Sequence, residues 1–320
     1  MKHTRTPVIL VICLLLHNPG KAQDDSSSKK TFTKFTLNYL TNAVYYARKD
    51  SSPVPYLRSS ITYNHRSGLY ISGGMALLVS SNEPTRIDLI DIDGGYNFTL
   101  GDLDAGAYVS KFFYSNASYA VNSELKGMAG FYAGYRAGII SIGAGGEMMF
   151  SSNTDLGSYI NLSHTFEKGE ENDQWTIVPT IQANAGTQYF NEAYYEFRKF
   201  SFPTTAGNNG SSSGSGNGNS NGKGNGKGHS NSSNSGSGGS TTTVAKTVTF
   251  YDRNRFTLLD VELSVPLNFE RKHWGVYANP VVAFPVNPAT FAIDNAIQKE
   301  KLSTVFFTEI GAYIKLQGKH

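Results

Sequence analysis

The chain has 320 residues, of which 39% are hydrophobic and 17% charged, with 33 Gly, 19 Tyr, 19 Phe and a single Cys. This composition is too polar for a helical membrane protein and too rich in glycine and aromatic residues for an ordinary enzyme of this length. Three of the 28 basic residues and no acidic residue fall in positions 1–23, so the later chain holds 25 basic and 25 acidic residues. This balance, without a cluster of Lys and Arg, argues against nucleic acid as a partner.

Residues 1–23 have the layout of a secretory signal peptide. Lys2 and Arg5 precede the apolar run Val8–Leu16, and small and polar residues follow it. The run is about half of the roughly 20 residues that a membrane-spanning helix needs, so we predict a cleaved signal rather than an anchor. Cys13 lies inside this segment, and the exported chain is therefore expected to have no disulfide.

The remainder of the chain, 24–320, alternates between apolar and polar residues. In residues 258–269, Leu259 and Val261 fall on one face of an extended chain, and Asp260 and Glu262 fall on the other. Successive side chains of a strand point to opposite faces, so this stretch has one apolar and one charged surface. The pattern predicts β-strands rather than helices.

The alternation defines about twelve strands of roughly 10 to 16 residues, the length of tilted membrane-spanning strands. In chain order they are 32–46, 56–66, 69–80, 86–99, 103–115, 125–137, 139–151, 157–168, 175–190, 255–270, 273–285 and 303–317. A sheet that spans lipid has to close, because open edges leave backbone groups unpaired. The sequence therefore predicts an all-β fold, a closed antiparallel transmembrane up-and-down β-barrel.

The connections between these strands alternate in length, which is an independent indication of a transmembrane barrel. Those after even-numbered strands are short, at Arg66–Gly68, Gly101–Asp102, Gly138, Lys168–Gln174 and Arg271–Lys272. Those after odd-numbered strands, at 47–55, 81–85, 116–124, 152–156, 191–254 and 286–302, include every long one. Transmembrane barrels have short periplasmic turns and long outer loops, so we place both termini in the periplasm and the chain in a bacterial outer membrane.

A soluble sandwich or a lipocalin-like barrel is the alternative, because it produces the same alternation with the apolar face turned inward. Strand length and loop asymmetry favour the membrane barrel. Aromatic residues near strand ends are typical of interfacial girdles: Tyr45, Tyr56, Tyr96, Phe98, Tyr135, Phe166, Trp175, Phe269 and Trp274.

The segment 205–243 is composed almost entirely of Gly, Ser, Asn and Thr. It has too little apolar surface to offset the entropy of ordering, so we expect a disordered extracellular loop. Two interpretations of this segment are retained: a surface decoration or glycan-presenting loop, and a tolerated insertion without a function.

If the apolar faces meet lipid, the polar faces line the lumen. The charged residues predicted to line it are Lys34, Arg58, Asp91, Asp93, Asp104, Arg136, Glu147, Asp260, Glu262, Glu309 and Lys315. They would either pair and fill the barrel or line a narrow cation-preferring channel. Twelve strands lie between the filled barrels of about eight and the open pores of about 16 to 18. We expect a narrow pore or a structural surface protein, with no solute identified.

An outer-membrane hydrolase is the competing hypothesis. Barrel phospholipases and lipid A deacylases place a His and a Ser two residues apart on one strand, where the imidazole can deprotonate the hydroxyl. His65 and Ser67 have this spacing, but Gly68 follows them and indicates a tight turn at the periplasmic end. We therefore expect no enzyme activity, and the scattered His residues indicate no metal site and no cofactor.

The chain resembles uncharacterised outer-membrane β-barrel proteins of the Bacteroidota. The resemblance is carried by Lys21-Ala22-Gln23 at the end of the signal, by the turn His65–Ser72 and by Gly94–Phe98. It implies fold and location, with outer-membrane lipid and the barrel-insertion machinery as partners and a monomer as the default state, and it transfers no catalytic residue. The chain departs from the common terminal aromatic of such barrels, because Ile314–His320 follows Tyr313.

Overall fold

The structure, a computed structural model, describes residues 30–50, 53–81, 84–118, 120–170, 173–191, 248–293 and 296–317. The predicted signal peptide (1–23) and the Gly/Ser/Asn-rich segment (205–243) lie outside the described residues. None of the helices in the described ranges is long and apolar enough to cross a membrane.

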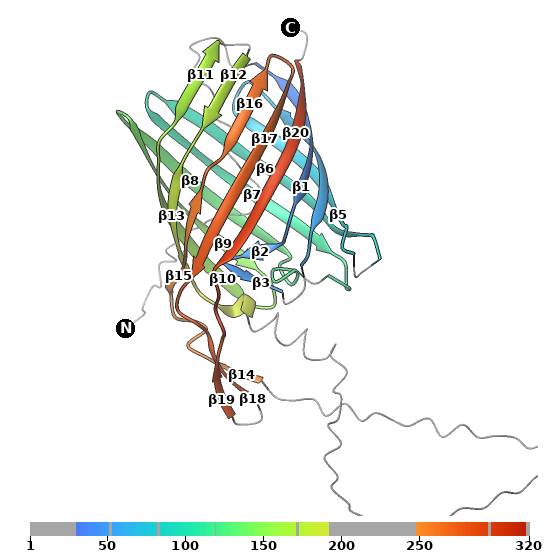
Figure 1. The fold of residues 1–320 in the computed structure, drawn as a ribbon, viewed down its shortest axis with the longest axis vertical. Helices are drawn as coiled ribbons and strands as arrows, with labels where there is room; N and C mark the ends of the chain where they lie inside the picture. The colour runs from blue at the N-terminus through green and yellow to red at the C-terminus, as the bar shows by residue number, and fades with distance from the viewer. Residues whose placement is uncertain are drawn as a thin grey trace, which may run out of the picture.

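Fifteen strand segments form one antiparallel sheet that closes on itself (Figure 1). They are β1 (Phe32–Leu40), β4 (Tyr56–Asn64), β5 (Leu69–Leu78), β6 (Arg86–Leu100), β7 (Leu103–Tyr114), β8 (Gly127–Ala137), β9 (Ile140–Phe150), β10 (Thr154–Ser163), β11 (Phe166–Glu170), β12 (Asp173–Ile177), β13 (Thr180–Gly186), β15 (Thr257–Ser264), β16 (Leu267–Arg271), β17 (Trp274–Pro285) and β20 (Val305–Gln317). β20 pairs with both β1 and β17, and these pairings complete the ring.

Three passages across the barrel are interrupted, so the fifteen segments make twelve passages. β12 and β13 are separated at Pro179, and β15 and β16 are separated at Pro266. Proline has no backbone N–H to donate to the ladder, which explains the break at both positions. The prediction of a closed antiparallel barrel of twelve strands is confirmed.

The first predicted strand is wrong at its end. The sequence alternation suggested 32–46, whereas β1 ends at Leu40 and the chain then turns away from the wall. Residues 43–47 form an uninterrupted run of apolar and aromatic side chains, all buried. Such a run cannot alternate between lipid and lumen, and it instead enters a hairpin that is enclosed on all sides.

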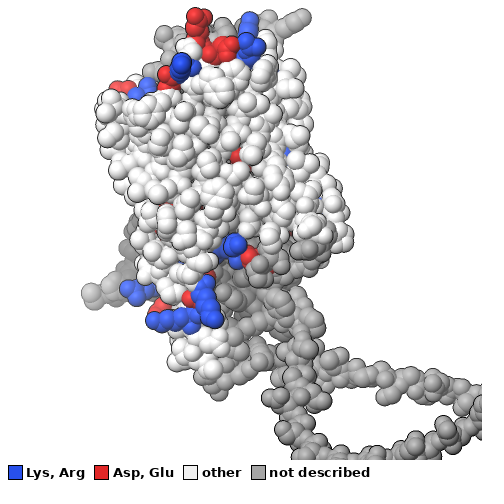
Figure 2. Space-filling model, in the orientation of Figure 1, with Lys and Arg blue, Asp and Glu red and all other residues white. Residues whose placement is uncertain are grey.

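The outer face of the barrel is apolar. Ile71, Val109 and Phe306 are 58%, 60% and 66% exposed, although the inward residues beside them are half-buried or buried. In Figure 2, Lys, Arg, Asp and Glu gather at the two ends of the visible face, and the broad belt between them is almost free of charge. An apolar surface of this extent is unsuited to water and suits lipid.

Aromatic side chains ring the belt at one end. The ring centroid of Phe269 lies 4.7 Å from that of Trp175 and 5.7 Å from that of Trp274. Tyr96 stacks on Phe98 with their ring centroids 6.1 Å apart. Two of the predicted girdle residues are wrongly placed. Tyr45 and Tyr56 are buried inside the barrel rather than exposed at its rim, because the first lies in the inward hairpin and the second points into the lumen.

The two ends of the barrel differ in their connections. At the short-turn end, turns of two to four residues join the strands, and Phe32 lies opposite both Asn64 and Gln317. Gly101 and Gly138 have φ of 60° and 64° there, which a two-residue hairpin turn requires and glycine adopts without strain. The opposite end is termed the long-loop end.

Two small sheets lie at the long-loop end. β14 (Val248–Tyr251), β18 (Thr290–Ile293) and β19 (Ala296–Lys299) form a three-stranded sheet that projects beyond the barrel (Figure 1). β2 (Val44–Tyr45) and β3 (Arg48–Lys49) form a separate two-stranded hairpin inside the barrel. Residues 41–50, which carry this hairpin, are termed the plug hairpin.

Candidate functional site: the barrel interior

The plug hairpin turns sharply between its two strands. Tyr46 and Ala47 have φ of 47° and 54°, the left-handed conformation that a two-residue hairpin turn needs at both central positions. A residue with a Cβ is strained there, by about 1 kcal/mol or more each. The surrounding packing must therefore hold this turn in place.

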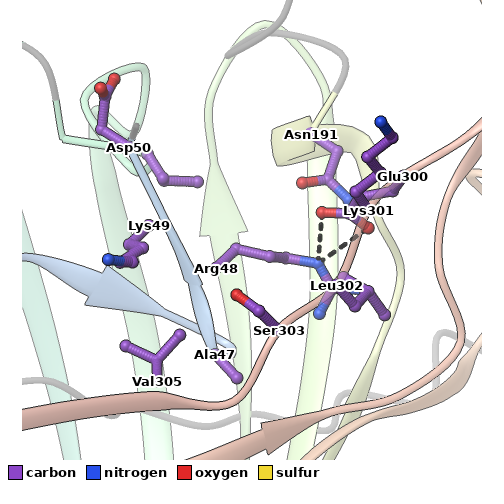
Figure 3. Close-up of a pocket in the computed structure, with 11 residues that line it drawn as sticks. Ala47, Arg48, Lys49, Asp50, Asn191, Glu300, Lys301, Leu302, Ser303 and Val305 are labelled. Atoms are coloured by element: carbon purple, nitrogen blue, oxygen red, sulfur yellow. Dashed lines mark hydrogen bonds and ion pairs between the residues drawn. The ribbon is translucent and has the colours of Figure 1, made fainter. Parts of the chain in front are cut away.

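Arg48 fastens the plug hairpin to the barrel (Figure 3). Its Nε donates to Glu300 Oε1 at 3.2 Å, and both side chains are almost fully buried. Its Nη1 donates to the carbonyl oxygens of Tyr46 and Leu259, and its Nη2 donates to those of Val286 and Asn287, at 2.8 to 3.4 Å. A buried guanidinium is stable only when its donors are satisfied in this way.

A cavity of about 210 Å³ lies beside this ion pair (Figure 3). Its lining is mostly polar and charged, and comes from the plug hairpin, from residues 300–305, from Val121 and from Asn191. Asp50 and Asn191 are themselves buried.

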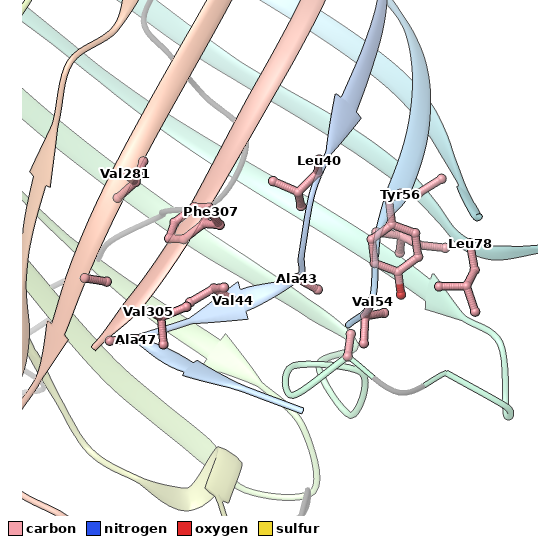
Figure 4. Packing of buried hydrophobic residues seen from close by; sticks show 14 residues of the cluster. Leu40, Ala43, Val44, Ala47, Val54, Tyr56, Leu78, Val281, Val305 and Phe307 are labelled. Atoms are coloured by element: carbon pink, nitrogen blue, oxygen red, sulfur yellow. The ribbon is translucent and has the colours of Figure 1, made fainter. Parts of the chain in front are cut away.

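The plug hairpin packs against opposite walls of the barrel. Val44 and Ala47 share one buried cluster with Val281, Val305 and Phe307 of β17 and β20 (Figure 4). Tyr45 and Tyr46 share a second cluster with side chains of β8, β9 and β15, namely Met128, Met149 and Leu259, and with Phe190. The hairpin therefore extends across the lumen rather than lying along one wall.

Tyr46 joins the hairpin to the inner wall by a hydrogen bond. Its hydroxyl donates to Glu147 Oε1 at 3.1 Å. Burial raises the pKa of the Tyr46 phenol, and the Glu147 carboxylate raises it further. The phenol stays protonated, as a donor to a carboxylate must be.

On β6 and β9, the inward side chains near the long-loop end are less exposed than those toward the short-turn end. Along β6, Asn97 is exposed, Asp93 is 6% exposed, Asp91 is 1% exposed and Asp88 is fully buried. Along β9, Gly143 is half-buried and Met149 is fully buried. The interior, termed the inner chamber, is therefore accessible to solvent from the short-turn end and is covered at the other end by the plug hairpin together with Val121, Leu125 and Phe190.

Several of the predicted lumen residues pair deep inside the inner chamber. Arg58 Nη2 donates to Asp91 Oδ2 at 2.6 Å. Glu309 Oε1 accepts from Asn38 Nδ2 at 2.9 Å and from the Tyr277 hydroxyl at 2.6 Å. Asp93, Glu147 and Asp260 are buried, and Glu262 lies next along the inner face of β15 from Asp260. Asp260 Oδ1 accepts from Asn184 Nδ2 at 2.6 Å.

The other predicted lumen residues lie toward the short-turn end. Lys315 pairs with Glu270, and Lys34 Nζ lies 5.4 Å from the centroid of the Tyr313 ring. Asp104 accepts from the Thr99 hydroxyl at 2.7 Å, and Arg136 is half-buried on the inner face of β8. Sequence reasoning missed Glu270, although continuing the alternation past Pro266 would have placed it inward. It also assigned Arg48 to a surface loop and overlooked Glu300.

Tyrosine rings lie flat over glycines of neighbouring strands on the inner wall. A Cβ at Gly106 would lie 2.7 Å from Tyr132, and a Cβ at Gly145 would lie 2.7 Å from Tyr159. The same holds for four more cross-strand pairs: Tyr70 over Gly95, Tyr108 over Gly130, Tyr277 over Gly311 and Tyr313 over Gly275. The glycines leave room for each ring against the wall, so the rings line the inner chamber without crossing it.

His65 and Ser67 lie in the exposed turn between β4 and β5. His65 Nδ1 and Ser67 Oγ are 2.8 Å apart, and Ser67 N donates to the same Nδ1 at 3.2 Å. Gly68 has φ of 98° and donates from its backbone N–H to the His65 carbonyl oxygen. These bonds close a tight turn. No three His, Cys, Asp or Glu side chains converge on a metal-binding position in the part of the chain that the structure describes.

No protein-family model and no curated protein matches the sequence. Among solved structures, the chain is similar to the NanC porin, with 8% identity and a TM-score of 0.41 over 89% of this chain and 100% of that chain. It is also similar to LpxR from Salmonella typhimurium (8% identity, TM-score 0.40, 88% and 99%) and to an outer-membrane channel from Pseudomonas putida F1 (9%, 0.38, 91% and 99%). Similarities at such identities and TM-scores say nothing of the role of this chain. Its closed antiparallel barrel is established by its own strand pairing.

Proposed function

We propose that the chain is a bacterial outer-membrane β-barrel that acts as a narrow, porin-like channel, closed in this state by the plug hairpin. Its short-turn end faces the periplasm, because transmembrane barrels have their short turns on that side. The observation that carries the proposal is the difference in exposure along β9, from the half-buried Gly143 toward the open end to Met149, which is fully buried against Tyr45 and Tyr46 of the hairpin.

A polar, partly hydrated interior favours a channel over a barrel that serves only as a scaffold. A scaffold of this size is most stable with a dry and fully packed core. Here Asn97, Arg136 and Asn161 remain partly or fully exposed on the inner face. The closure is confined to one end and depends on the plug hairpin, whose turn at Tyr46 and Ala47 is strained. A short strained segment inside a lumen is suited to moving as a plug.

Planar-bilayer conductance of the purified full chain tests the proposal. Replacing residues 43–49 with a short Gly/Ser linker should produce current steps that are rare or absent in the unmodified protein. The matched control replaces Ser152-Asn153, exposed at the same end but outside the lumen, with Gly-Ser and should behave like the unmodified protein. If the hairpin replacement folds and yet carries no current at any voltage, the barrel is a structural surface protein instead.

Location is tested separately. We expect the protein in the outer-membrane fraction. Its electrophoretic mobility should shift on heating, because a folded closed barrel and its unfolded chain migrate differently. Recovery in the soluble periplasmic fraction would overturn the membrane proposal. The outer-membrane lipid, the barrel-insertion machinery and a monomeric state belong to the same proposal, as does the Bacteroidota lineage.

The hydrogen bond between His65 and Ser67 favours a lipid hydrolase as the second candidate function, since it joins a hydroxyl to a potential base. We assign the pair to the turn, because both side chains are exposed and a catalytic His needs a third group to orient it. Phospholipase and lipid A deacylase assays of the purified barrel should show no turnover. Turnover that disappears in Ser67→Ala would establish the hydrolase.

A further inference from the structure

We propose that the inner chamber binds an extended organic cation with separated amine groups, entering from the short-turn end; this inference rests on the proposed channel function and names its class of solute. Six acidic side chains of the described residues line the deep zone of the chamber, defined as its inner face between the plug hairpin and the pair Lys315–Glu270: Asp91, Asp93, Glu147, Asp260, Glu262 and Glu309. Arg58 is the one cation among the described residues of the same deep zone. Arg48 acts on Asp260 through its charge but donates no hydrogen bond to it, because its donors serve Glu300 and backbone carbonyls.

The acids are spread around the ring rather than gathered at one point. Asp91 and Asp93 belong to β6, and Asp260 and Glu262 belong to β15. In the strand order, five passages separate β6 from β15 in either direction, so the two pairs lie on opposite walls. Because no three such groups converge on a metal position within the described residues, the arrangement favours a ligand whose positive charges are some distance apart.

Within the part of the chain that the structure describes, two buried carboxylate oxygens lack a hydrogen-bond donor. Asp91 uses Oδ2 for Arg58, and its Oδ1 has no partner. Asp260 uses Oδ1 for Asn184, and its Oδ2 has no partner. Both side chains are at least nine-tenths buried. A buried acceptor without a donor is costly, and an ammonium group would supply one at each wall.

The tyrosine rings of the inner wall add a second mode of cation recognition. A cation is attracted to the face of an aromatic ring as well as to a carboxylate. The chain's own Lys315 is held in this way near the short-turn end, because it pairs with Glu270 and lies 5.3 Å from the centroid of the Tyr313 ring. Tyr108, whose hydroxyl lies 3.4 Å from Glu147 Oε2, provides the same combination deeper in the chamber.

Binding of 1,8-diaminooctane, whose longer chain suits groups on opposite walls, to the purified full-length barrel in detergent, measured by calorimetry, tests the inference. The diamine should bind, and 1,8-octanediol, its neutral counterpart, should not. Asp260→Asn keeps the shape and the bond from Asn184 but removes the charge, and it should weaken binding by about tenfold or more. Asp173→Asn, at an exposed pair with Arg271 outside the chamber, should leave binding unchanged and is the matched control.

Equal binding of the diol, or unchanged diamine binding in both Asp260→Asn and Asp91→Asn, would overturn the inference. Ca²⁺ binding as tightly as the diamine would overturn it as well, since that result requires converging carboxylates. If the variants fail to fold, competition on the unmodified protein between diamine, diol and Ca²⁺ still decides. The assay needs neither a membrane nor a current, so its failure is distinguishable from a failure of the channel proposal in bilayers.

Discussion

At the short-turn end, turns of two to four residues join the strands and inward side chains such as Asn97 stay exposed, whereas at the long-loop end the plug hairpin packs on Met149 and Leu259, which are fully buried. The same strands form both ends. The difference therefore comes from the connections and from what they insert into the lumen, and not from the wall.

The two ends also use charge differently. At the short-turn end, Arg271 and Asp173 pair at 2.7 Å with about half of each side chain exposed. At the long-loop end, Arg48 and Glu300 pair at 3.2 Å with 4% and 6% exposed. Water screens the first pair and leaves it weak, whereas the second has lost its hydration and depends on its partners. At the closed end, the buried charges of Arg48 and Glu300 therefore depend on each other, so the loss of one partner destabilises the other.

The largest effect is expected from Arg48→Met. The substitution leaves the Glu300 carboxylate buried without its cation, and breaking a buried pair in this way costs about 3–5 kcal/mol. We expect the plug hairpin to be released while the barrel wall stays folded, seen as rapid hydrogen exchange of residues 41–50 with a retained mobility shift on heating. The double variant Arg48→Met/Glu300→Met removes both charges and should recover most of the protection. Full protection in the single variant would contradict the fastening role.

Thiol labelling measures the accessibility of the two ends directly, because the only Cys, Cys13, lies in the predicted signal. Asn97→Cys is exposed at the short-turn end, whereas Ala76→Cys is buried in the cluster that contains Val44 of the plug hairpin. Asn97→Cys should therefore react with a small thiol reagent roughly a hundredfold faster. Adding Arg48→Met should accelerate Ala76→Cys and leave Asn97→Cys unchanged. Similar rates at both positions in the parent would mean that the lumen is open throughout.

A smaller effect is expected from the inner wall between the two ends. A Cβ at Gly130 would collide with the ring of Tyr108, whereas a Cβ at Gly134 would find its nearest neighbours at 3.9 Å and 4.0 Å. Both glycines lie on the inner face of β8. We expect Gly130→Ala to lower the free energy of unfolding by about 1–3 kcal/mol through overpacking, and Gly134→Ala to leave it nearly unchanged. The measurement is a urea titration in which the folded fraction is determined from the electrophoretic mobility shift on heating. Equal effects would mean that the tyrosine is not seated on its glycine.

The wall of the barrel was predictable because alternation with a period of two is a local property of the sequence. Residues 258–269 place Asp260 and Glu262 inward without reference to any other strand, and the structure has them there. The same alternation is wrong for Leu259, which was expected on the outer face but is fully buried inside the barrel, because the register with β13 shifts beside Asp260. The plug hairpin was not predictable in this way. Its apolar run, 43–47, has no period, and its position depends on Glu300, Val305 and Phe307 at the other end of the chain.

The interior was predictable by residue type but not by partner. Lys315 and Arg58 were expected to face the lumen, yet their pairing with Glu270 and Asp91 follows from strand register, which the sequence pattern does not define to one residue. The tyrosine and glycine pairs have the same origin. Tyr108 and Gly130 are 22 positions apart, and only the pairing of β7 with β8 brings them together.

The smallest effect is expected at the exposed pair of the short-turn end. Asp173→Asn should change the free energy of unfolding by less than about 1 kcal/mol, because solvent screens the pair and long side chains lose entropy in forming it. The small contribution should fall further as salt is raised from 0.05 to about 0.5 M, since screening shortens the range of exposed charges. The Arg48 effect should persist over the same titration, because a buried pair is screened far less. If salt reduced both effects alike, the Arg48–Glu300 pair would have to be hydrated, and the long-loop end would be no more tightly sealed than the short-turn end.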